Sequence, residues 1–144
     1  MKNENLDILD EVNKGATMGM NAIHYVSEKV GDESFKQVLD VEYNKYKQIY
    51  NRVNDLYSNY SDKTPHETNH MEKMMTWSGI QMSTMTDKSN SKISELLMQG
   101  TNMGIIEGRR LLNQNHNIEP DVENILNDFV VMQEDSVETL KKYL

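Results

Sequence analysis

The sequence predicts an all-α fold, and three features of the chain lead to that expectation. Apolar residues recur three or four positions apart along most of the chain, which is the spacing of one face of an α-helix. Only two prolines and seven glycines occur, whereas good helix formers such as Leu, Met, Glu and Lys are abundant. A chain of 144 residues is the size of one domain, so we expect a single helical domain over residues 1–144.

The first half of the chain is expected to form a helical hairpin. Small or apolar residues place one helix over residues 5–30, and Gly31 is expected to end it. Asp32 is suited to cap a second helix over residues 33–60. Because the connection is so short, the two helices are expected to be antiparallel neighbours.

A shorter helix and a second hairpin follow. Thr64 and Glu67 have the spacing of a capping box, which predicts a helix over residues 65–86. Further apolar stripes predict helices over residues 91–114 and 120–143. Two hairpins joined by a long crossover helix predict an up-down-down-up four-helix bundle.

This arrangement, with the local patterns of residues 40–45 and 133–144, resembles the ferritin-like, rubrerythrin-related superfamily, in a bacterial branch. Members hold two iron ions in the bundle core, with a Glu from each of two helices and a Glu-x-x-His from each of the others. The resemblance places the family's ligands at Met20, Glu42, Lys45, Gln133 and Ser136. Of these side chains only Glu42 can bind iron, which implies that the di-iron site and its oxidase chemistry have been lost.

Glu42 has two interpretations. It is either a polar anchor for a small ligand bound near Glu42 and Lys45, or a carboxylate paired inside the bundle. In the second case its partner is Lys45, a tyrosine hydroxyl or Gln133, because an unpaired buried charge is costly. Both interpretations remain open at this stage.

A second candidate site is the string His66-Glu67-Thr68-Asn69-His70. It matches H-E-x-x-H, the helical pattern in which two histidines one turn apart bind zinc and the glutamate activates water. A zinc hydrolase also needs a third protein ligand, for which the sequence offers no candidate, and Glu67 has a competing role in the capping box. The alternative that remains is a zinc or copper site formed by His66, Glu67 and His70.

Methionines follow this string at helical spacing. They are Met71, Met74, Met75, Met82 and Met85, with Trp77 beside them. The stripe is either a flexible apolar surface packed on the bundle, a surface for a protein partner, or, with His70, a set of soft ligands for copper(I). An exposed Trp77 would indicate a protein contact.

Glycines also recur inside the expected helices. They are Gly15, Gly19, Gly100, Gly104 and Gly108. Each costs about 1 kcal/mol relative to alanine in a helix interior. We therefore expect close packing or a partner to account for them.

Charge and composition limit the function further. A formal charge of −8 opposes binding to nucleic acid or anionic lipid. Cysteine is absent, and no apolar run suits a membrane span or signal peptide, so we expect a cytoplasmic protein without membrane insertion. The expected function is a non-catalytic structural or protein-interaction module without a cofactor, which forms a homodimer or binds another protein. The alternatives are a zinc or copper protein and a small-ligand binder.

Overall fold

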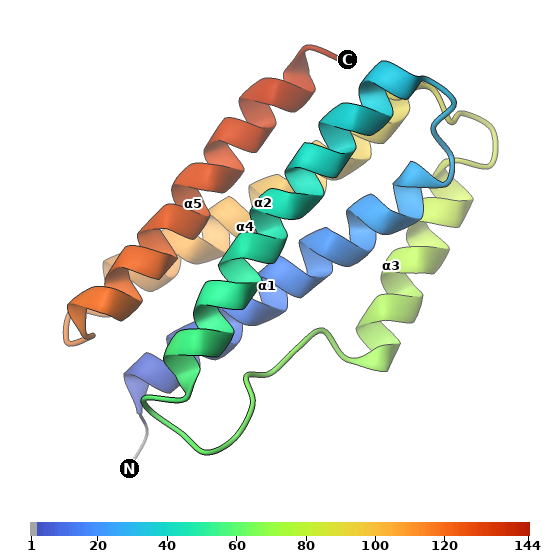
Figure 1. The fold of residues 1–144 in the computed structure, drawn as a ribbon. Coiled ribbons are helices and arrows are strands. Elements are labelled where there is room, and N and C mark those ends of the chain that lie inside the picture. Colours follow the sequence, from blue (N-terminus) through green and yellow to red (C-terminus); the bar gives the residue numbers. More distant parts are fainter. Residues whose placement is uncertain (1–2) are drawn as a thin grey trace.

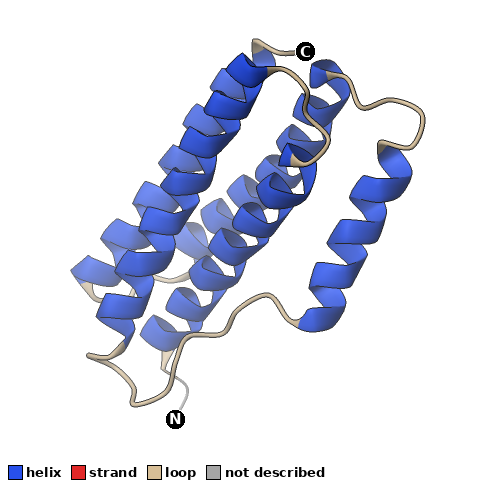
Figure 2. Cartoon of the chain, turned by 45° about the vertical axis from the view of Figure 1, so that its right-hand side comes forward, coloured by secondary structure: helices blue, strands red, loops and turns tan. Residues whose placement is uncertain are grey.

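Five helices make up the fold, as a computed structural model that describes residues 3–144 shows (Figures 1 and 2). They are α1 (Glu4–Ser27), α2 (Glu33–Tyr57), α3 (His70–Ser83), α4 (Asn90–Gln114) and α5 (Pro120–Lys141). The described residues contain no strand, so the all-α prediction is confirmed. None of these helices is long and apolar enough to cross a membrane.

Local capping signals explain where the long helices begin. The Asp32 carboxylate accepts the backbone N–H of Ser34 at 2.9 Å and that of Phe35 at 3.4 Å, which caps α2 as expected. The side chain of Asn90 donates to the same carboxylate at 3.0 Å. This bond and the two capping bonds lower the pKa of Asp32. The starts of α2 and α4 are therefore tied together.

The four long helices share one core. α1 packs against α2, α4 packs against α5, and further contacts join α1 to α4 and α2 to α5. Figure 1 shows α1 and α5 running in one direction and α2 and α4 in the other. Each helix contributes fully buried side chains, for example Val12, Leu39, Ile93 and Leu126. Burying such apolar stripes is the main source of helix stability in proteins of this kind.

The fifth helix, α3, lies outside the other four and packs along α1 (Figure 1). It begins at His70, where the Asn69 side chain caps it by accepting the N–H of Glu72 at 2.8 Å. Residues 64–69 are not helical, so the prediction that this helix begins at the Thr64–Glu67 capping box is wrong. Gly31 does not end α1 either, because α1 ends earlier, at Ser27.

Most apolar side chains of α3 face solvent and not the bundle. Its single buried residue is Ile80. Its four methionines are between 54% and 74% exposed, and Trp77 beside them is 47% exposed. Met85, just beyond the end of α3, is 78% exposed. We call Met71, Met74, Met75, Met82 and Met85 the methionine face. The interpretation of these methionines as side chains packed on the bundle is wrong.

Candidate functional site

A cavity of about 640 Å³ lies between α1, α3 and α4 and reaches inward to side chains of α2 and α5. Its lining is mostly apolar and includes Ile23, Leu97, Leu126, Phe129 and Leu140. A concave, largely apolar space of this size with a few convergent polar groups is typical of small-molecule sites. The cavity is therefore the candidate functional site.

Glycines on α1 and α4 line this cavity. Four of the five glycines in these helices lie against side chains of α2 or α5: Gly15, Gly19, Gly104 and Gly108. A Cβ atom at Gly19 would lie 2.6 Å from Cε1 of Tyr46, and one at Gly108 would overlap Cγ2 of Val130. Close packing therefore accounts for these four positions. Gly100 faces open space, because a Cβ atom added there would meet nothing within 4 Å.

We call the polar part of the lining, formed by Glu42, Tyr46, Thr101, Gln133 and Ser136 with their apolar neighbours, the inner wall of the cavity. Glu42 is 3% exposed. Its Oε1 accepts a hydrogen bond from Nζ of Lys45 at 3.0 Å. Its Oε2 accepts from the hydroxyl of Ser136 on α5. The interpretation of Glu42 as a paired carboxylate is thus confirmed for Lys45, while Ser136 is the second partner. Of the other positions that the resemblance pointed to, Gln133 also lines the cavity, whereas Met20 is partly buried against the core.

Tyr46 and Thr101 complete the polar part of the inner wall. Burial raises the pKa of Tyr46 to about 12, a hydrogen bond with Thr101 acts in the opposite direction, and the charge of Glu42 adds to the increase. The phenol is therefore neutral at physiological pH. The sequence did not single out Thr101. The signal available was that Thr101 shares a helical face with Leu97 and Gly104.

Gln133 is the one polar side chain of the inner wall with an unsatisfied donor. It is 2% exposed, and its Nε2 has no hydrogen-bond partner among residues 3–144. Its amide lies against Gly104, where an added Cβ atom would overlap Oε1. A buried donor without a partner costs about 1–3 kcal/mol. A ligand atom that accepts this hydrogen would remove that cost.

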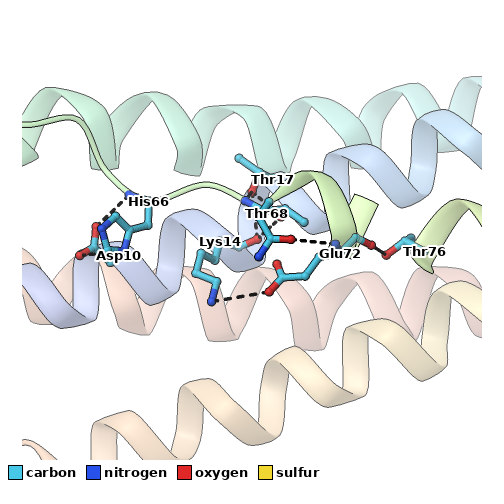
Figure 3. Close-up of polar contacts among 8 residues, drawn as sticks. Asp10, Lys14, Thr17, His66, Thr68, Glu72 and Thr76 are labelled. Atoms are coloured by element: carbon cyan, nitrogen blue, oxygen red, sulfur yellow. Dashed lines mark hydrogen bonds and ion pairs between the residues drawn. The ribbon is translucent and has the colours of Figure 1, made fainter. Parts of the chain in front are cut away.

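The H-E-T-N-H string lies away from the inner wall, as an extended segment bound to α1 (Figure 3). The backbone N–H of His66 donates to Asp10 at 2.9 Å, and its carbonyl accepts from Asn13 at 2.9 Å. The N–H of buried Thr68 donates to the hydroxyl of Thr17 at 3.0 Å. These bonds use the backbone groups that a helix would need for itself. The string anchors the linker between α2 and α3.

The expected helical zinc-site geometry is therefore wrong. The His66 side chain is 73% exposed, and its Nδ1 lies 3.7 Å from a carboxylate oxygen of Asp10. Glu67 accepts a hydrogen bond from the hydroxyl of Tyr50 at 2.8 Å. His70 begins α3 beside the methionine face. Across residues 3–144, no group of three or more His, Asp or Glu side chains could hold a metal ion.

Comparison with family models, curated proteins and solved structures finds no match to this chain. Function is therefore inferred from the cavity and its chemistry, since a fold alone does not specify an activity.

Proposed function

We propose that this chain is a ferritin-like four-helix bundle that has lost its di-iron ligands and binds a small molecule in the cavity. The up-down-down-up directions of α1, α2, α4 and α5 and the long connection between α2 and α4 support this architecture. Glu42, Gln133 and Ser136 occupy the positions assigned to family ligands, and all three line the cavity. Because Glu42 already binds Lys45 and Ser136, we propose binding without catalysis.

The observation that carries this proposal is the unpaired amide nitrogen of Gln133. Folded proteins rarely leave a buried donor without a partner, and such an exception calls for a specific explanation. The mostly apolar walls suit a hydrocarbon body, and the Gln133 N–H suits a hydroxyl or carbonyl oxygen on that body. The ligand is therefore largely apolar with one acceptor group.

We expect 1-octanol to bind saturably, and we expect the substitution Gln133→Leu to weaken that binding about fivefold, the value of one hydrogen bond. Leucine keeps most of the side-chain volume and removes the amide. Titrations of 1-octanol followed by ¹⁵N chemical shifts would measure both constants. Gln114→Leu, at an exposed position at the end of α4, is the matched control. Failure of 1-octanol to saturate, or equal affinity in Gln133→Leu, would contradict the proposal.

The methionine face favours a second candidate function, self-association. Each of its five side chains is apolar and exposed, whereas the protein carries a formal charge of −8 that makes two copies repel each other. A face built from uncharged side chains is where two copies can meet with the least repulsion. We therefore propose a second copy of this chain as the occupant of the methionine face.

Sedimentation equilibrium would test this second candidate. We expect a dimer for the unsubstituted protein and a monomer after the double substitution Met74→Gln and Met82→Gln, because amides would then replace apolar contacts at the interface. Val41→Gln changes an exposed apolar residue on α2 and should leave the dimer intact. A monomeric unsubstituted protein would exclude this function.

A further inference from the structure

The charges that line the cavity are strongly unbalanced. Its charged lining side chains are Glu11, Lys14, Glu42, Glu72 and Glu107. Four carboxylates therefore face one ammonium group. A mostly apolar wall strengthens electrostatic interactions relative to water, so this imbalance acts on whatever enters the cavity.

Two of these carboxylates have a cationic partner within 3.0 Å. Nζ of Lys45 lies 3.0 Å from Glu42, and Nη1 of Arg110 lies 2.5 Å from Glu107. Their charge is largely balanced within the protein. The remaining charged lining side chains are Glu11 and Lys14 on α1 and Glu72 on α3, which together leave one excess negative charge.

Among the four carboxylates, Glu72 is the one with an unsatisfied buried oxygen. Its Oε2 is buried and has no hydrogen-bond partner among residues 3–144. Its Oε1 is 4.0 Å from Nζ of Lys14, a long ion pair that Figure 3 shows reaching from α3 to α1. Glu11 is exposed at the edge of the lining and has no ion pair within the same range of residues. Two carboxylates next to the cavity thus have the capacity to bind a cation.

We propose that the ligand is an amphiphilic amine, whose protonated nitrogen binds at Glu72 and Glu11 while an acceptor group elsewhere on its apolar body binds Nε2 of Gln133. This inference rests on the proposed small-molecule function and assigns the class of ligand. The unpaired oxygen of Glu72 accepts a hydrogen bond from the ammonium group, and the unpaired amide nitrogen of Gln133 donates one to the acceptor group. An anionic amphiphile of the same length is repelled by the same carboxylates.

Three probes of equal chain length distinguish a preference for a cationic ligand from a preference for a neutral or an anionic one. They are 8-amino-1-octanol, 1-octanol and 8-hydroxyoctanoate. All three carry a hydroxyl for Gln133, and they differ only at the other end, which is an ammonium, a methyl or a carboxylate. We expect the amine to bind about tenfold more tightly than the carboxylate at low salt, with the difference shrinking as salt is added. Isothermal titration calorimetry of the full chain would measure each affinity.

Glu72→Gln tests where the amine binds. It should reduce the preference for amine over carboxylate to about threefold, since one of the two available charges is removed. Glu123→Gln makes the same change in net charge at an exposed position on α5 and should keep the tenfold preference. Equal binding of amine and carboxylate, or equal effects of the two substitutions, would overturn the inference. If 1-octanol binds and depends on Gln133 in either case, the proposed function stands on its own.

Discussion

Replacing Gly19 by alanine is expected to lower the free energy of unfolding by about 2 kcal/mol, although alanine is the better helix former. The new Cβ atom would lie between 2.6 and 2.8 Å from three ring atoms of Tyr46. That ring is buried between α1 and α5, with an edge contact to Phe129 at a centroid distance of 6.3 Å. The contact with Phe129 and the hydrogen bond with Thr101 oppose rotation of the ring, so we expect the backbone of α1 to shift as well.

Gly100→Ala is the matched control for this prediction. It introduces the same methyl group in the middle of a long helix, but nothing lies within 4 Å of the new atom. We expect it to raise the free energy of unfolding by about 1 kcal/mol, the difference in helix propensity between the two residues. Urea denaturation followed by far-ultraviolet circular dichroism would measure both variants. Equal shifts in the two variants would show that the contact with Tyr46 has no effect.

Asn13→Ala is expected to lower the free energy of unfolding by about 2–3 kcal/mol and to release the linker between α2 and α3. Asn13 is fully buried. Its amide nitrogen donates to the carbonyl of His66 at 2.9 Å, and its oxygen accepts from Asn54 at 3.2 Å. Alanine would leave the carbonyl of His66 without this donor, and it would remove one of the two hydrogen bonds of the Asn54 amide, whose other bond goes to the carbonyl of Tyr50. Denaturation and limited proteolysis within residues 58–69 would report the two effects.

His66→Ala provides the contrast. The imidazole is mostly exposed, and the hydrogen bonds of His66 to α1 come from its backbone, which alanine retains. We expect a change below about 0.5 kcal/mol, as for other exposed positions. A loss of stability in His66→Ala as large as that in Asn13→Ala would assign the anchoring role to the imidazole instead.

The four long helices could be predicted from the sequence because each has a continuous apolar stripe and a local signal near its start. Their ends differ from the expected positions by no more than three residues. The start of α3 could not be predicted in this way. Asp10, Asn13 and Thr17 hold the linker through bonds that span more than 50 residues, and local propensity contains no information about such partners.

The polar side chains of the candidate site were predictable in part. The resemblance to the ferritin-like superfamily pointed to Glu42, Gln133 and Ser136, and the structure brings all three side chains to the cavity. The cavity itself was not predictable, because it depends on how far α1 and α4 lie from each other. The methionine stripe illustrates the same limit. Its periodicity defines one side of a helix and does not specify whether that side faces the bundle or solvent.

Trp77 gives the protein a built-in optical probe of one helix. It is the only tryptophan in the chain, and it lies half-exposed on α3, outside the core shared by the other four helices. Tryptophan fluorescence excited at long wavelengths therefore reports the surroundings of α3 alone. The far-ultraviolet circular dichroism of the backbone amides comes mainly from the other four helices. Any event that covers, tilts or detaches α3 becomes visible in solution without a label, and separately from unfolding of the whole protein.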